Sequence, residues 1–205
     1  MAERLAPRAR QIVQAARELL EQEGAEALTM RRLAERLGIR APSLYKHLPD
    51  KAAVEAAVIA TGLVDVAAAL EAALAAARSA GTEPLAALAA AYRAFALAHP
   101  HLYRLMTGQP LPRDRLPAGV EARAAAPLLQ AAGNQDLARA AWAFAHGMVQ
   151  LELARRFPPG ADLHAAWQEG ITALQGRVPA RDAAMGGAGP ADASRRRPSG
   201  PARRA

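Results

Sequence analysis

A tyrosine, a lysine and a histidine follow one another at residues 45–47, inside the stretch LTMRRLAERLGIRAPSLYKHLPDK that covers residues 28–51. A lysine ammonium group binds phosphate as a point charge, and a tyrosine hydroxyl on a rigid ring can hydrogen-bond to a phosphate oxygen. The chemistry that these residue types favour is therefore binding of a polyanion such as DNA.

Helical spacing predicts which way these side chains point. If the segment from Ala41 to Leu48 is a helix, a rotation of 100° per residue places Leu44 and Leu48 on one face. Pro42 fits the first turn of that helix, and Pro49 ends it. The opposite face is small, polar and basic, so it could approach DNA bases closely. That face and its flanks are formed by Pro42, Ser43, Tyr45 and Lys46.

Two predicted helices precede this one, at residues 7–23 and 30–37. Thr29 is suited to cap the second of them, and Gly38 is suited to close it. Two short helices joined by a tight glycine turn form a helix-turn-helix, whose second helix enters the major groove of DNA. We therefore expect a three-helix DNA-binding domain over residues 1–51.

Arg31 and Arg32 stand in the first turn of a predicted helix, where the helix dipole disfavours cations by about 0.3 kcal/mol or more. Phosphates of DNA would reverse this balance, because anions suit the free N–H groups of a helix N-terminus. An ordinary solvated helix surface is the alternative interpretation of both arginines.

The rest of the chain also has the pattern of helices. Hydrophobic residues make up 52% of the sequence but aromatic residues only 4%, which favours closely packed helices over a β-sandwich. Asp50 can cap a long alanine-rich helix that ends near Ala80. We expect an all-α protein in which residues 52–179 form a helical bundle. The further predicted helices span residues 84–98, 99–107, 119–132, 135–156 and 161–176.

Positive charge is concentrated at the two ends of the sequence. Residues 1–51 carry 10 basic and 7 acidic side chains, residues 52–179 carry 10 of each, and residues 180–205 carry 6 and 2. This balance favours a polyanionic partner, although a solvated surface can give the same balance. Residues 180–205 are rich in glycine, proline, serine and arginine and have little to bury, so we expect a disordered basic tail.

Several classes of protein are disfavoured by what the sequence lacks. Without cysteine there can be no disulfide, thiolate metal site or cysteine nucleophile, which suits the cytoplasm. Charges interrupt each alanine-rich stretch before 18 residues, so we expect no membrane span. We find no catalytic constellation, phosphate-binding glycine loop or cofactor motif, and expect neither an enzyme nor a cofactor. His99 and His101 have no further ligand placed beside them, so we expect no metal site.

The order of residues in the N-terminal region closely resembles the DNA-binding domain of TetR-type bacterial transcriptional regulators, over about a quarter of the chain. The resemblance is carried by Leu28-Thr29-Met30, Leu33-Ala34, Leu37-Gly38-Ile39, Ser43-Leu44-Tyr45-Lys46-His47 and Asp50-Lys51. Arg40 stands where many members have a capping serine. For His47, capping or packing is an alternative to contact with DNA. The expected DNA contacts are Thr29, Arg31, Arg40, Ser43, Tyr45, Lys46, His47 and Lys51.

This resemblance implies a homodimeric repressor that binds a palindromic operator in double-stranded DNA. A fourth helix would connect the DNA-binding domain to a C-terminal helical domain that dimerises and binds a small-molecule effector. The segment AWAFAHGMVQLELARRF further resembles the subset with a tryptophan and a His-Gly pair on the penultimate helix, sometimes called the WHG type. A nonspecific architectural DNA-binding protein that uses the basic tail is the alternative function.

Bulky residues are few in the expected bundle and could line an effector cavity, although core packing is the alternative. His146 is open to three interpretations: a hydrogen-bonded core histidine, an effector contact or a metal ligand. Gly147 would let a second helix come close, as a dimer interface requires, and we add Val149 and Leu153 as interface candidates. The cavity candidates are Tyr92, Phe95, Tyr103, Met106, Trp142 and His146.

Overall fold

A computed structural model of the chain describes residues 5–178, and this part is built from helices without a strand. The expected all-α class is confirmed. The expected tail at residues 180–205 lies outside the described residues. In chain order the elements are α1 (Pro7–Glu23), η2 (Ala25–Ala27), α2 (Met30–Arg36), α3 (Ala41–Tyr45), α4 (Lys51–Ala80), α5 (Pro84–Ala98), α6 (Pro100–Thr107), η3 (Arg113–Arg115), α7 (Val120–Ala132), α8 (Gln135–Leu153) and α9 (Leu163–Gln175).

The expected helix caps are present. The Thr29 hydroxyl accepts a hydrogen bond from the backbone N–H of Arg32 at 3.2 Å, and the Asp50 carboxylate accepts one from Ala53 at 2.6 Å. Gly38 has a φ of 64°, in the left-handed region that favours glycine after a helix. These local contacts set the start of α2, the start of α4 and the turn before α3.

Three helices, α3, α8 and α9, are each three residues shorter than the sequence predicts, and α9 spans Leu163–Gln175 rather than 161–176. α3 ends at Tyr45 rather than at residue 48, although the backbone N–H of Leu48 still donates to the carbonyl of Leu44 at 3.0 Å. α8 ends at Leu153 rather than at residue 156, and Arg155 beyond it has a φ of 52°. The short 3-10 helices η2 and η3 were not predicted, because three residues carry no recognisable period.

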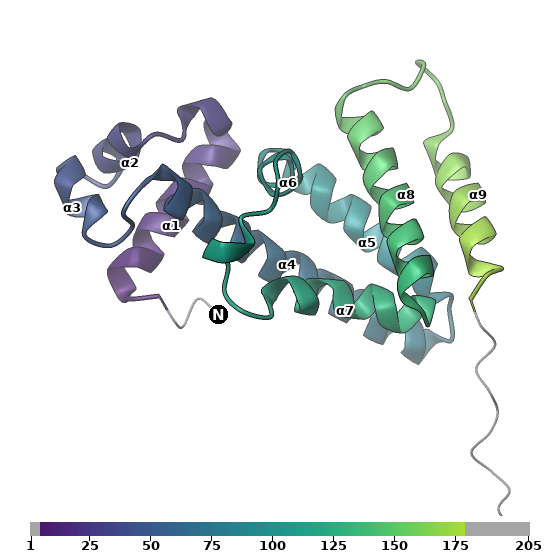
Figure 1. Cartoon of the computed structure of the whole chain (residues 1–205). Coiled ribbons are helices and arrows are strands. Elements are labelled where there is room, and N and C mark those ends of the chain that lie inside the picture. The colour runs from purple at the N-terminus through teal and green to yellow at the C-terminus, as the bar shows by residue number, and fades with distance from the viewer. Residues whose placement is uncertain (1–4, 179–205) are drawn as a thin grey trace, which may run out of the picture.

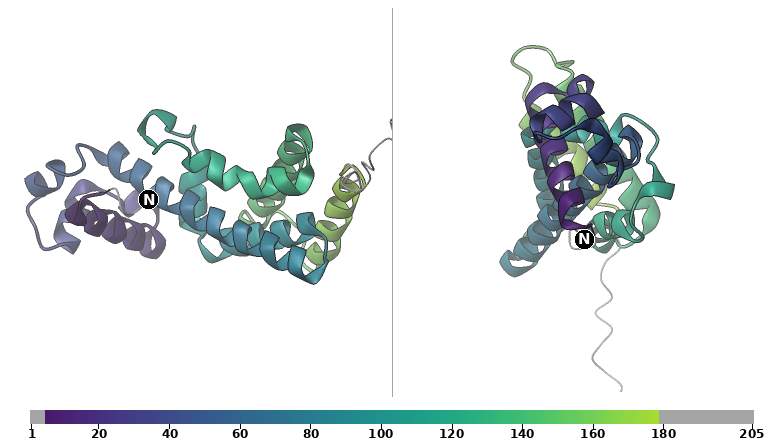
Figure 2. Two further views of the ribbon diagram at one scale, coloured as in Figure 1. Left: turned by 90° about the horizontal axis from the view of Figure 1, so that it is seen from below. Right: turned by 90° about the vertical axis from the view of Figure 1, so that its left-hand side faces the viewer.

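α4 is the axis that joins the two ends of the molecule (Figure 1). α1 packs against its first turns, α5, α6 and α7 pack along the remainder, and α8 and α9 pack against α5. In a view from below, the N-terminal helices and α9 lie at opposite ends of an elongated molecule (Figure 2). Val54 and Val58 of α4 belong to the same core cluster as Leu19 and Leu33, so the N-terminal helices use α4 to complete their core.

Within the described residues, α4 is the one helix that is long and apolar enough to cross a membrane, judged by length and composition. Half of its apolar segment is buried inside the protein. α4 also packs closely at Gly62, where a Cβ atom would lie 2.5 Å from the Met106 sulfur. This close approach brings α6 against the middle of α4.

Candidate DNA-binding face and effector cavity

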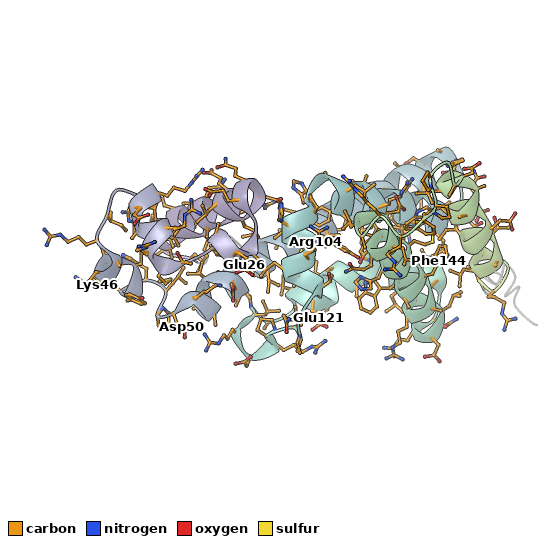
Figure 3. The ribbon with its side chains drawn as sticks, turned by 90° about the horizontal axis from the view of Figure 1, so that it is seen from above. Glu26, Lys46, Asp50, Arg104, Glu121 and Phe144 are labelled. Carbon is orange, nitrogen blue, oxygen red and sulfur yellow. The ribbon has the colours of Figure 1, made fainter. Side chains whose placement is uncertain are left out.

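The helix α3 is divided into a buried and an exposed face as the spacing of its residues predicts. Leu44 is fully buried and Leu48 nearly so, and both join the core with α1 and α2. Lys46 is exposed and Tyr45 has 48% of its surface accessible. Lys46 lies at the end of the molecule far from Phe144 of α8 (Figure 3). A tyrosine hydroxyl and an ammonium group are therefore presented to an external partner.

The two arginines at the start of α2 differ in their surroundings. The Arg31 side chain is 84% exposed, and its nearest acidic partner, Glu35, is 3.8 Å away. Arg32 instead forms an ion pair of 2.5 Å with Glu23 of α1. Arg31 is thus more available to a phosphate than Arg32, whose interaction ties α2 to α1.

The remaining DNA-contact candidates lie at the ends of α3 and α4. Arg40 is exposed at the N-terminus of α3, and its side chain makes no capping hydrogen bond. Lys51 opens α4 and pairs with Glu55 at 3.4 Å. Ser43 is half-buried and His47 is exposed. All the candidates therefore lie on α2 or α3, beside the ends of these helices, or at the start of α4, and none is in the core.

A cavity of about 680 Å³ lies among α4, α5, α6, α7 and α8, well within the range of small-molecule sites. Its wall is mainly aliphatic, with Leu63, Val66 and Leu70 contributed by α4. The structure brings all the cavity candidates from the sequence to this wall. They are Tyr92, Phe95, Tyr103, Met106, Trp142 and His146.

A chain of hydrogen bonds joins three of these residues. The hydroxyls of Tyr92 and Tyr103 are 3.0 Å apart, and the Tyr103 hydroxyl is 2.7 Å from Nδ1 of His146. Burial raises the pKa of both tyrosines and lowers the pKa of His146. All three groups are consequently neutral near pH 7. Trp142 stacks on His146, with ring centroids 5.7 Å apart.

The mouth of the cavity includes polar residues that sequence reasoning missed. Arg113 of η3 donates two hydrogen bonds to Glu121 of α7, at 2.9 and 2.7 Å. These hydrogen bonds lower the pKa of the Glu121 carboxyl and raise that of Arg113. Thr107 and Gln109 also line this region. No sequence signal marked Gln109 and Arg113, because the segment between α6 and α7 has no helical period.

The same 3-10 helix η3 contacts the start of α4. Arg115 donates to the two carboxylate oxygens of Asp50 at 2.8 and 3.2 Å. The pKa of Asp50 is lowered first by the backbone N–H of Ala53 and then by Arg115. Two residues of one short segment, Arg113 and Arg115, thus connect the cavity mouth to the cap beside α3. Asp50 and Glu121 appear along the same edge of the molecule in Figure 3.

The interface candidates on α8 occupy three different environments. Val149 is fully buried in its own protomer among α5, α8 and α9, so the expectation that it contacts a second copy is wrong. Leu153 is half-buried and packs against the same core. At Gly147, by contrast, a Cβ atom would meet no atom within 4 Å.

A buried ion pair that the sequence did not reveal fixes α9 to the bundle. Glu152 has a side chain only 7% exposed and accepts from Arg93 of α5 and from the indole N–H of Trp167, the latter at 2.6 Å. In residues 5–178 we find no group of three histidine or acidic side chains that could hold a metal ion. The bundle residues therefore offer an apolar cavity with a few hydrogen-bonding groups.

Comparison with known proteins identifies the family. Residues 12–58 match the model described as "Bacterial regulatory proteins, tetR family", and residues 85–174 match "Tetracyclin repressor-like, C-terminal domain". An uncharacterised HTH-type transcriptional regulator of Mycobacterium tuberculosis is 32% identical over 151 residues, which cover 69% of this chain and 68% of the relative.

Solved structures agree with this match over most of the chain. A possible TetR family transcriptional regulator from Streptomyces coelicolor A3(2) is 25% identical, with a TM-score of 0.58, covering 82% of this chain and 97% of its own. A protein of unknown function from Rhodococcus sp. RHA1 is 26% identical, with a TM-score of 0.69 and coverage of 85% and 96%.

The chain belongs to the TetR family and is a transcriptional regulator with an N-terminal DNA-binding domain. The description of the C-terminal match does not name the subset with the tryptophan and His-Gly pair. That narrower assignment stays an expectation.

Proposed function

We propose that the protein is a cytoplasmic, homodimeric repressor that binds a palindromic operator and leaves it when a small molecule enters the cavity. The observation that carries this proposal is the position of α4. Its first turns share a core with the recognition helix α3, and Leu63, Val66 and Leu70 further along it form part of the cavity wall. One rigid element therefore joins the two sites.

The exposed face of α3 is the proposed reader of the operator. Lys46 would neutralise a phosphate, and the Tyr45 hydroxyl would fix the position of the helix on the backbone. The small Ser43 lets the helix approach the base edges. Arg31 and Lys51 would exchange their weak pairs with Glu35 and Glu55 for DNA phosphates.

The segment η3 supplies a direct path for release. A ligand that displaces Arg113 from Glu121 at the cavity mouth would also move Arg115, two residues away. Arg115 holds the Asp50 carboxylate, which caps α4 directly after α3. Movement of this segment would therefore change how the recognition helix is held.

Dimerisation would make this movement decisive for DNA binding. Two recognition helices engage two half-sites together when they lie about 34–36 Å apart, or at another matched separation. By thermodynamic linkage, the effector must weaken DNA binding by the same factor as DNA weakens effector binding. The coupling free energy between two such sites is commonly about 1–3 kcal/mol.

Selection of bound sequences from a random duplex library tests the proposal. We expect the selected sequences to share a palindromic consensus, and we expect unrelated DNA to compete poorly with that consensus for the protein. An architectural DNA-binding protein would yield no consensus. Lys46→Ala should then weaken binding to the selected operator by about 1–3 kcal/mol at fixed salt. The matched control is Arg78→Ala, which removes an exposed cation at the opposite end of α4. Equal affinities of the two variants would remove α3 from the interface.

A further inference from the structure

The charged residues that line the cavity all lie at the protein surface. Among the lining residues, the charged ones are Arg113, Glu121 and Arg139, and all of them are exposed. Each is also paired: Arg113 with Glu121, and Arg139 with Asp136 at 3.0 Å. The interior wall has aliphatic groups, the two tyrosines and His146. A charged group on the buried end of a ligand would find no counter-charge there, which makes its burial unfavourable.

The hydrogen-bond chain has a preferred direction. Its members differ as acceptors, because an imidazole nitrogen accepts a hydrogen bond more strongly than a phenol oxygen. The Tyr92 hydroxyl can then donate to Tyr103, and the Tyr103 hydroxyl to Nδ1 of His146. The reverse direction would make the Tyr103 oxygen accept from the imidazole N–H, which is the weaker of the two arrangements, and would also leave one proton, that of Tyr92, unused. In the preferred direction every proton is used except one, the Nε2–H of a neutral His146.

We propose that the ligand of this cavity is an uncharged, largely aromatic molecule whose buried end presents one hydrogen-bond acceptor, such as a ketone oxygen, to Nε2–H of His146. This inference rests on the proposed effector site and specifies the chemical class that the site takes. His146 is the specificity-determining residue, and the tyrosines act through it by fixing its tautomer.

The size and shape of the site suit such a molecule. About 680 Å³ accommodates two or three fused rings with substituents. Trp142 is stacked on His146 and has 51% of its surface exposed, so an indole face remains for a flat ligand to cover. The surrounding aliphatic side chains would bury the remaining rings.

Three related naphthalene compounds test the inference with the full-length protein, using equilibrium dialysis. 1-Acetonaphthone carries a ketone acceptor, 1-ethylnaphthalene is the matched hydrocarbon, and 1-(1-naphthyl)ethylamine is a cation at pH 7. We expect the ketone to bind about fivefold more tightly than the hydrocarbon, as one neutral hydrogen bond predicts, and the cation to bind most weakly.

Two variants assign the selectivity to one nitrogen atom. A glutamine side chain places its amide near the position of Nε2, whereas asparagine places it near Nδ1. His146→Gln should keep the preference for the ketone, and His146→Asn should lose it, while circular dichroism shows both variants folded. Equal binding of ketone and hydrocarbon to the unmodified protein would overturn the inference, as would tightest binding of the cation or no binding of any compound.

These outcomes are separable from those of the proposed function. If the compounds bind in the expected order but leave the operator complex intact at saturation, the chemistry of the cavity stands and the effector role fails. If the compounds do not bind while the protein still selects a palindromic operator, the cavity inference fails and the DNA-binding role stands.

Discussion

Gly147 offers a clean test of dimerisation, because its surroundings within one protomer are open. A Cβ atom built at this position meets nothing within 4 Å, so the first atom of a Gly147→Leu side chain meets no obstacle inside the chain. Replacing a glycine in a helix interior instead stabilises that helix by up to about 1 kcal/mol. If a second copy packs against α8 here, the added side chain is accommodated only by separating the helices.

The expected size of the effect follows from the symmetry of the interface. Overpacking a close contact costs about 1–3 kcal/mol, and a twofold interface contains the substituted site twice. The dimer should therefore lose about 2–6 kcal/mol, and its dissociation constant should rise about 30-fold to about 20,000-fold. Operator affinity should fall as the dimer dissociates, because a monomer on one half-site binds more weakly than a dimer on two joined half-sites.

Sedimentation velocity over a range of protein concentrations and an operator titration measure these effects. The matched control is Gly170→Leu on α9, where a Cβ atom would collide with the Phe144 ring. That variant should lower the free energy of unfolding, whereas Gly147→Leu should not. A Gly147→Leu protein that remains fully dimeric and binds the operator normally would refute the assignment of this surface to the interface.

Two further predictions concern the link at η3 and the buried histidine. Arg115→Ala should leave operator affinity close to that of the unmodified protein. Saturating 1-acetonaphthone should release less labelled operator from this variant, because the contact between Arg115 and Asp50 is lost. Full release would exclude this link. Burial lowers the pKa of His146 in the folded state, so the unfolded chain takes up the proton first as the pH falls below about 6.5, and folding stability should decrease on acidification. Urea unfolding at pH 7.5 and 5.5 should show a smaller decrease for His146→Gln, and an unchanged decrease would argue against a buried neutral histidine.

The parts of the fold that follow local rules could be predicted from the sequence. Thr29 and Asp50 cap helices because a side-chain oxygen three residues before a free N–H reaches it in any context. Leu44 and Leu48 are buried because helical spacing puts both on one face. The outward direction of Lys46 follows from the same spacing, without knowledge of the remaining fold.

Contacts between distant segments could not be predicted in this way. Arg115 and Asp50 are 65 residues apart, and η3 itself has no period to recognise. Val149 was misassigned for a related reason. A stripe at helical spacing identifies one face of α8, but the positions of α5 and α9 decide whether that face meets its own protomer or another.

The geometry of α4 makes a small change at the cavity large at the recognition helix. Leu70, on the cavity wall, and Lys51, beside α3, are 19 residues apart, or about 28 Å at about 1.5 Å per residue. A tilt of about 5° at the cavity would displace α3 by about 2.5 Å, and opposite displacements in two protomers would change their separation by about 5 Å. Hydrogen bonds to bases tolerate far less, because their donor–acceptor distances vary by only about 0.5 Å. The chain has no cysteine, so Gln22→Cys on the exposed side of α1 places a single spin label in each DNA-binding domain. Pulsed electron resonance should show a change of several ångströms between the two labels when a releasing ligand is added, whereas an unchanged distance on release would exclude the tilt of α4 as its cause.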